Sequence, residues 1–208
     1  VRNPHEIDKG QYDLERQISK WVSTMFSFLF GDGAAAFVMS KVSDEDNAMK
    51  IGKITHAVNF NDSDYRKASV RLAGNTSSHM YEHELTASSD ILKRSLEYSK
   101  KVLARSFGND IDTFDEQQIK SFLAEQKKVM IHTGSLKILD GFKNLYNLDY
   151  NQVQESYETL KEYGNLTGVS LPTVLSKAMT QKNSIVGKSL LIGITMGFGL
   201  DIVEVENI

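Results

Sequence analysis

The stretch VMIHTGSLKILDGF, residues 129–142, decides the fold class, because a short apolar run gives way within it to a helical pattern. The run that ends at Ile131 is typical of a strand, and apolar residues from Leu136 onward recur at helical spacing. His132 therefore lies where a strand ends and a helix begins, which is where binding sites collect in open α/β sheets. The helix that starts near Ser135 also directs its amide dipoles toward this corner.

The rest of the chain repeats this alternation of strands and helices, which predicts a layered α/β domain. Polar residues 1–20 have few apolar anchors and indicate a surface segment or connector, and polar residues 59–83 indicate a long loop. Apolar periodicity and turn residues place the other elements. Strands are predicted over 37–42, 49–58, 128–131, 189–195 and 201–206, and helices over 91–107, 115–126, 151–163 and 168–180.

Composition excludes several classes of protein. The 208 residues are 40% hydrophobic and 25% charged with a net charge of −3, which fits a soluble globular protein with a substantial core. No apolar run approaches the ~18 residues of a membrane span, and scattered Lys and Arg give no basis for nucleic-acid binding. Cysteine is absent, so this chain supplies no disulfide, thiolate metal site or cysteine nucleophile. Because the chain starts Val1-Arg2-Asn3-Pro4, we expect either that it begins part-way through a larger protein or that a preceding segment was cut away.

Histidines are the first candidates for chemistry. His5, His56, His79 and His83 lie in polar or loop-like surroundings and are expected at the surface. His79 and His83 are spaced like ligands on one helix face, but their loop context and the lack of a third ligand argue against a metal site. His132 has two interpretations that its position leaves equally open, a hydrogen-bonded strand-end residue or a functional group.

The second candidate lies in EYGNLTGVSLP, residues 162–172, where Asn165 follows Gly164 at the break between two predicted helices. Asparagine is common there as a cap or turn residue. Its side-chain amide can also donate to a developing oxyanion, and neighbouring glycines let a substrate approach the backbone.

Four stretches in order carry a resemblance to a known family: FLFGDGAAA (28–36), IHTGSLKILDGF (131–142), KEYGNLTGVSLPTVL (161–175) and GFGLDIVEV (197–205). Together they resemble the C-terminal half of thiolase-fold condensing enzymes. They are most similar to the chalcone and stilbene synthase group, the type III polyketide synthases, and next to the 3-oxoacyl-[acyl-carrier-protein] synthase III enzymes. The resemblance implies a mixed five-stranded sheet flanked by helices over residues 21–208, packed against a similar N-terminal half.

The resemblance also implies roles for residues. In that family a cysteine takes the acyl group, while a histidine and an asparagine hold the thioester oxygen of a malonyl extender as it loses carbon dioxide. His132 and Asn165 match the last two by motif, and the cysteine belongs to the absent half. Phe30 matches a pocket-gating phenylalanine, although an ordinary core aromatic is the alternative. The loop of Gly197, Phe198 and Gly199 matches the cavity floor.

What the resemblance implies about substrates and partners is equally specific. It implies no cofactor, acyl-CoA or acyl-carrier-protein thioesters as substrates, and an acyltransferase that performs decarboxylative Claisen condensation in the cytoplasm. Expected partners are the N-terminal half, a second copy in a homodimer and an acyl carrier protein, with neither nucleic acid nor membrane. The alternative is a non-catalytic partner subunit, which the missing cysteine favours and the presence of both His132 and Asn165 disfavours.

The chain departs from the chalcone synthase pattern at two of these stretches. Thr133 and Ser135 stand where that group has proline and glycine, and Leu200 and Asp201 replace a Pro-Gly step. The cyclisation chemistry and the product of that group therefore cannot be carried over.

Overall fold

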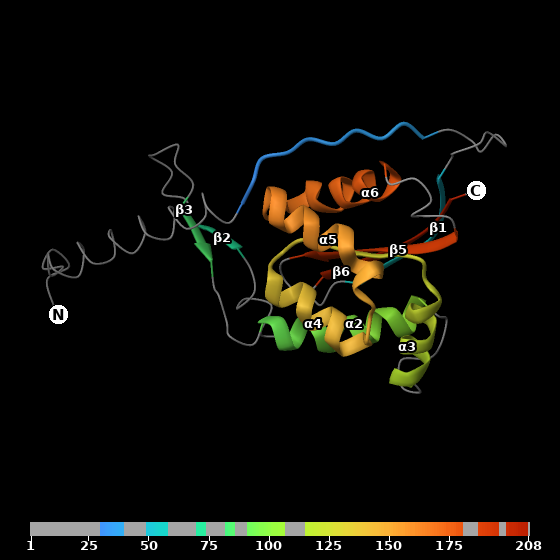
Figure 1. Cartoon of the computed structure of the whole chain (residues 1–208). Helices are drawn as coiled ribbons and strands as arrows, with labels where there is room; N and C mark the ends of the chain where they lie inside the picture. Colours follow the sequence, from blue (N-terminus) through green and yellow to red (C-terminus); the bar gives the residue numbers. More distant parts are fainter. Residues whose placement is uncertain are drawn as a thin grey trace, which may run out of the picture.

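The computed structural model describes residues 30–39, 49–57, 70–73, 82–85, 91–106, 115–180, 187–195 and 199–207 (Figure 1). The expected connector 1–20 lies outside these residues, as do His5, His79, Gly197 and Phe198. For β2 (Val70–Ala73) and β3 (Glu82–Leu85), including His83, only the backbone is described.

The main sheet is mixed and has the order β1-β6-β5-β4. Its strands are β1 (Met49–Ala57), β4 (Val129–Ile131), β5 (Gly187–Thr195) and β6 (Gly199–Asn207). β4 and β5 are parallel, whereas β6 is antiparallel to both of its neighbours, β5 and β1. The expected mixed sheet is confirmed, with four strands among the described residues instead of five.

Helices cover both faces of this sheet (Figure 1). One face of the sheet forms a core cluster with three helices: α2 (Ile91–Ser106), α3 (Glu116–Glu125) and α4 (Leu136–Tyr146). The other face packs against α6 (Ser170–Thr180). α5 (Tyr150–Tyr163) lies along β4, and the 3-10 turn η3 (Thr167–Val169) leads into α6. The helices predicted from periodicity are thus all present.

Polar side chains fix where these helices begin. Asp115 accepts from the Gln117 amide at the start of α3, and Ser135 accepts from the Ile138 amide at the start of α4. A capping box of Asp149 and Gln152 opens α5. The helix that follows His132 therefore starts at a defined residue, which fixes the loop between β4 and α4.

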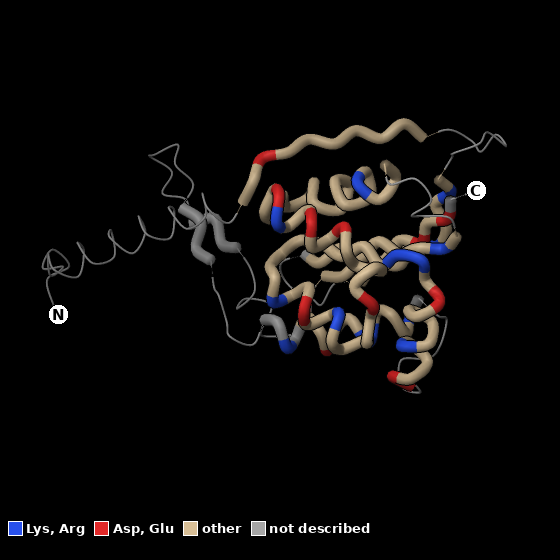
Figure 2. The backbone as a smooth tube through the Cα atoms, viewed as in Figure 1, with Lys and Arg blue, Asp and Glu red and all other residues tan. Residues whose placement is uncertain are grey.

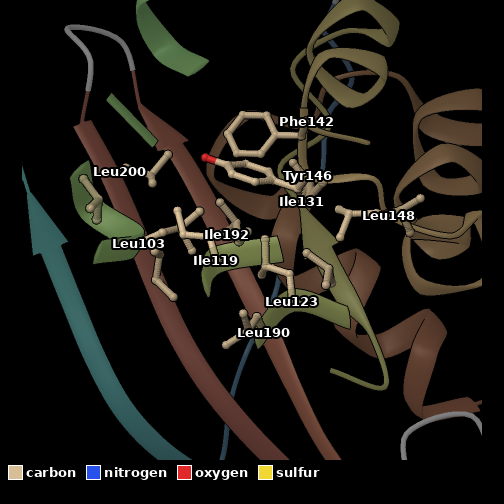
Figure 3. Close-up of a cluster of buried hydrophobic side chains, with 14 of the residues drawn as sticks. Leu103, Ile119, Leu123, Ile131, Phe142, Tyr146, Leu148, Leu190, Ile192 and Leu200 are labelled. Atoms are coloured by element: carbon tan, nitrogen blue, oxygen red, sulfur yellow. The ribbon is translucent and has the colours of Figure 1, made fainter. Parts of the chain in front are cut away.

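The larger core cluster fills the space between the sheet and α2, α3 and α4 (Figure 3). Ile131, Ile192 and Ile202 form one row of it across β4, β5 and β6, because they pair in register. Met130 and Val205 point to the opposite face, where they meet Val174 of α6. Strands buried on both faces need nearly continuous apolar runs, which is what β4 and β5 have.

The open edge of β4 is covered by α5. The Ile131 amide donates to the Ser156 hydroxyl at 2.8 Å, which pairs a backbone group that the strand ladder leaves free. Just before β4, the Lys128 ammonium contacts the Glu155 carboxylate at 2.6 Å and the Asn151 carbonyl at 2.7 Å. Both charged side chains are buried, so this ion pair fixes α5 against β4 in the protein interior.

Two expectations of secondary structure need correction. Residues 37–39 of the expected strand 37–42 form no strand; they are extended and exposed, while 40–42 lie outside the described residues. The expected loop 59–83 contains β2, and β3 begins within it and pairs with β2. Each of these strands has only four residues, which is too short a run for apolar alternation to distinguish a strand from a loop.

No helix among the described residues is both long enough and apolar enough to cross a membrane.

Candidate active site

His132 continues the line of β4 at the end of the strand. Its amide donates to the Ile192 carbonyl at 2.9 Å, and its own carbonyl accepts from the Gly134 amide at 2.9 Å. The backbone is therefore fixed on both sides of the residue, between a buried strand and the start of α4. The imidazole is largely withdrawn from water, and this burial lowers the pKa of His132 below its ordinary value of 6.5. The ring is consequently neutral at pH 7.

Gly134 provides the space into which this ring fits. A Cβ at position 134 would lie 3.4 Å from His132 Cδ2 and 3.7 Å from Nε2, and only 2.9 Å from Ile138 Cδ1. Any larger residue would press on the imidazole or on the first turn of α4. Because Gly134 has no side chain, the His132 ring lies directly against the backbone at this position.

Asn165 lies in a tight turn between α5 and η3. The turn requires unusual backbone angles, with φ of 73° at Gly164 and 53° at Thr167. The Asn165 Oδ1 atom accepts from the Thr167 amide at 2.9 Å, which fixes the side-chain amide and identifies its nitrogen as the donor end. That nitrogen, Nδ2, points to the Gly134 carbonyl at 3.4 Å.

A second hydrogen bond joins the same two loops. The Thr133 hydroxyl donates to the Gly164 carbonyl at 3.2 Å, and Thr133 is completely buried. The His132 ring and the Asn165 amide are therefore both placed beside Gly134 by loops that are bonded to each other. Sequence reasoning named Thr133 only as a departure from the chalcone synthase pattern and gave Gly134 no role, and the Thr-Gly step is the signal that could have identified both.

Phe30 belongs to the same neighbourhood. Phe30 and Asn165 form an isolated parallel bridge, in which the Gly31 amide donates to the Asn165 carbonyl at 3.0 Å. Phe30 is 37% exposed in this chain. The structure thus brings together three of the residues singled out from the sequence: Phe30, His132 and Asn165.

Gly199 is the described part of the expected cavity floor. It is buried at the start of β6 and pairs with Thr195 at the end of β5. Since β5 runs parallel to β4, Gly199 lies at the same end of the sheet as His132. Gly197 and Phe198 fall outside the described residues.

His56 lies on β1 with its side chain exposed, as expected, and contacts the Asp201 carboxylate of β6. The described residues contain no cluster of three or more His, Cys, Asp and Glu side chains that could hold a metal ion.

The lowered pKa of His132 makes stability depend on pH. Below about pH 6.5 the unfolded chain binds a proton that the buried ring resists, so the free energy of unfolding should fall as the pH drops through this range. His132→Gln removes the titrating group and should lose less stability than the unchanged chain between about pH 7.5 and about 5.5. Urea unfolding at both pH values measures this difference. Equal losses in the two proteins would show that burial of His132 does not control the effect.

Gly31 should tolerate no side chain. A Cβ there would lie 2.5 Å from the Tyr163 carbonyl oxygen, a backbone atom that cannot move aside. Gly31→Ala should therefore break the bond to Asn165 and cost roughly 1–3 kcal/mol. Gly33→Ala is the matched control, because its Cβ would meet the Val169 side chain at 3.2 Å, which can adjust. Thermal unfolding and hydrogen exchange at residue 31 test this; similar losses for both variants would refute it.

Comparison with known proteins rests on structure alone, because no family model and no curated protein sequence matches the chain. A fungal type III polyketide synthase, ORAS, superposes with a TM-score of 0.60 at 12% identity over 77% of this chain and 41% of that one. The C-terminal type III polyketide synthase domain of Steely1 from Dictyostelium gives 0.59 at 18% identity, over 81% and 43%. The chain has a thiolase-like fold.

A third similar structure is CsyB complexed with CoA-SH, with a TM-score of 0.58 at 12% identity over 77% of this chain and 41% of that one. At these identities the likeness establishes the thiolase-like fold and no more than the fold. This chain spans about two fifths of the length of the three structures, between 41% and 43%.

Proposed function

We propose that this chain is the C-terminal half of an acyltransferase that condenses an acyl thioester with a malonyl thioester, releasing carbon dioxide. The observation that carries the proposal is that His132 and Asn165 both meet Gly134. The imidazole lies over Gly134 and the Asn165 amide nitrogen points to its carbonyl. Two N–H donors of different loops thus lie beside one another at the carboxyl end of β4.

The chemistry needs such a pair of donors. When the malonyl carboxylate leaves as carbon dioxide, its bonding electrons form a carbon–carbon double bond and the thioester carbonyl pair moves onto oxygen. Fixed donors in a dry site stabilise that oxyanion, and each is worth about 3–4 kcal/mol. The enolate carbon then attacks the acyl-enzyme carbonyl, the carbon–sulfur bond breaks and the thiolate leaves.

The environment of each donor suits this role. Burial keeps the His132 ring neutral, so its N–H can donate without bringing a proton that would quench the enolate. The Asn165 amide nitrogen carries two hydrogens, and its 3.4 Å contact with Gly134 engages only one of them. Phe30, bridged to the backbone of Asn165, lies where it can border the acyl pocket.

The nucleophile must come from outside this chain, which has no cysteine. Residues 30–39 run above α6 as an extended segment without charge beyond Asp32 (Figure 2). Its exposed apolar side chains include Phe37, Val38 and Met39, and Ile54 of β1 is also exposed. Apolar surface of this kind favours association, and we assign it to the N-terminal half.

The donor substrate in this proposal is a thioester of CoA or of an acyl carrier protein. The CoA-SH bound in the CsyB structure supports the first of these for that protein, and by analogy for this one. A homodimer of the assembled protein is the expected oligomeric state.

The second candidate function is a non-catalytic partner that keeps the fold without the chemistry. The absence of cysteine favours it. The fixed arrangement of Asn165 disfavours it, because a non-catalytic partner has no chemical need for this strained turn with φ of 53° at Thr167.

Complementation separates the two candidates. The 208-residue chain alone should yield no condensation product from acyl-CoA and malonyl-CoA. Mixed with a polypeptide that supplies the N-terminal half and its cysteine, it should release carbon dioxide and form the β-keto thioester. Condensation by the chain alone, or none by the assembled protein, would refute the proposed function.

A further inference from the structure

β4 and α5 are bonded to each other at successive points and end together at the candidate site. The Ile131 amide donates to the Ser156 hydroxyl at 2.8 Å, and two residues farther on the Thr133 hydroxyl donates to the Gly164 carbonyl at 3.2 Å. The two elements run in the same direction, because the later residue of one meets the later residue of the other. The proposed donors follow the ends of these elements directly, so the last bond lies beside both of them.

The bond from Thr133 restrains the peptide group that leads into Asn165. A peptide group is planar, so holding the Gly164 carbonyl oxygen fixes the orientation of the whole plane and with it the Cα atom of Asn165. Gly164 has φ of 73° and ψ of −152°, backbone angles that essentially only glycine adopts. Glycine has no side chain to restrict the rotation of this plane. The Thr133 hydroxyl therefore supplies a restraint that the backbone of the turn lacks.

Of the two hydrogen bonds that join these loops, the one from Thr133 is the shorter. The Asn165 amide nitrogen lies 3.4 Å from the Gly134 carbonyl, beyond the usual range of about 2.7–3.2 Å for an N–H donor. The Thr133 side chain is completely buried, so water does not compete for its hydroxyl. Proline, which the chalcone synthase pattern has at position 133, carries no hydroxyl and could not make this bond.

We propose that Thr133 is a positioning residue of the oxyanion site, which acts through Gly164 to keep the Asn165 amide beside the His132 ring. Thr133 is buried and its hydroxyl is bonded to a carbonyl, so it does not touch substrate. This inference rests on the proposed function, which supplies the oxyanion that both donors bind. Without the hydroxyl the Asn165 turn should shift, whereas His132 stays bonded to the Ile192 carbonyl at the end of β4.

The kinetic test replaces the hydroxyl by a methyl group of similar size. In the assembled protein Thr133→Val should lower kcat for malonyl decarboxylation by roughly 10-fold and leave KM unchanged, because a misplaced donor is felt only as charge develops on the oxygen. Thr133→Ser keeps the hydroxyl and should restore the rate. Thr173→Val is the matched control: it removes a hydroxyl that donates at 2.9 Å to the Val169 carbonyl, four residues back in the same segment, and should decarboxylate normally.

Hydrogen exchange tests the positioning itself, without any reaction. In the 208-residue chain, NMR of the Asn165 side-chain NH₂ group should show exchange with water that is roughly 5–10-fold faster in Thr133→Val, the effect of losing one hydrogen bond. Thr133→Ser should exchange at the rate of the unchanged chain. Thr133→Ala also lacks the hydroxyl but needs less space, so it should reproduce the faster exchange if valine disturbs the fold. Circular dichroism identifies the variants that fold normally.

Three results would overturn the inference. They are unchanged Asn165 exchange in both Thr133→Val and Thr133→Ala, a Thr133→Ser variant as slow in decarboxylation as Thr133→Val, and an equal loss in Thr173→Val. Failure of the condensing function has a different signature. If the assembled protein released no carbon dioxide while exchange still rose in Thr133→Val, the condensing function would be refuted and the hold of Thr133 on Asn165 supported.

Discussion

Replacement of His132 by alanine is expected to lower malonyl decarboxylation by the assembled protein by roughly 10²–10³-fold, and Asn165→Ala should do the same. Each change removes one N–H donor from the oxyanion that forms when carbon dioxide leaves. Neither residue is needed to acylate the cysteine of the other half, so transfer of the acyl group should continue. Release of labelled carbon dioxide and mass spectrometry of the acyl-enzyme measure the two steps on one sample.

Asn144→Ala is the matched control, since Asn144 is exposed on α4, close in sequence to His132 but away from the loop of Gly134. It should decarboxylate at the rate of the unchanged protein. Decarboxylation that survived in both His132→Ala and Asn165→Ala would disprove the roles assigned to these residues. Equal loss in all three variants would indicate misfolding of α4 instead.

Lys128→Met is expected to cause the largest loss of stability, about 3–5 kcal/mol. Lys128 and Glu155 form a buried ion pair at 2.6 Å, and the Glu155 side chain is 0% exposed. Removing the ammonium leaves a carboxylate inside the protein without its partner, and its second oxygen, Oε2, already has no hydrogen bond among the described residues. Urea unfolding followed by circular dichroism gives the free energy directly.

Two further variants separate the buried charge from lost packing. The double variant Lys128→Met with Glu155→Leu removes both charges and should recover most of the stability. Lys177→Met removes the partner of two partly exposed carboxylates, Glu162 at 2.6 Å and Glu158 at 3.5 Å, and should cost no more than about 1 kcal/mol. If the double variant were as unstable as Lys128→Met alone, loss of packing and not the unpaired charge would explain the result.

The sheet and helices of the second half of the chain were predictable because their signals are local. The apolar run at 129–131 and the periodicity from Leu136 each specify one element, and β4 and α4 begin within a residue of these expectations. The structure of segment 37–39 was not predictable, because its apolar residues fit a strand equally well whether or not a partner strand exists. A strand is completed by hydrogen bonds to another segment, which its own sequence does not specify.

The sequence identified two residues of the candidate site, His132 and Asn165, but not the hydrogen bonds that position them. His132 and Asn165 were singled out by motif, whereas the bond from Thr133 to Gly164 joins residues that are far apart in the sequence. The pairing of His56 with Asp201 was missed for the same reason. His56 was expected to be a plain surface residue, and only the register of β1 with β6 places it beside the carboxylate.

The most direct test of the central claim is a crystal structure of the assembled protein with a malonyl thioester analogue that cannot lose carbon dioxide. The thioester oxygen should lie about 2.7–3.1 Å from a ring nitrogen of His132 and from Nδ2 of Asn165 at the same time. An analogue bound with that oxygen beyond hydrogen-bond reach of either side chain would contradict the assignment of these residues as a shared oxyanion site.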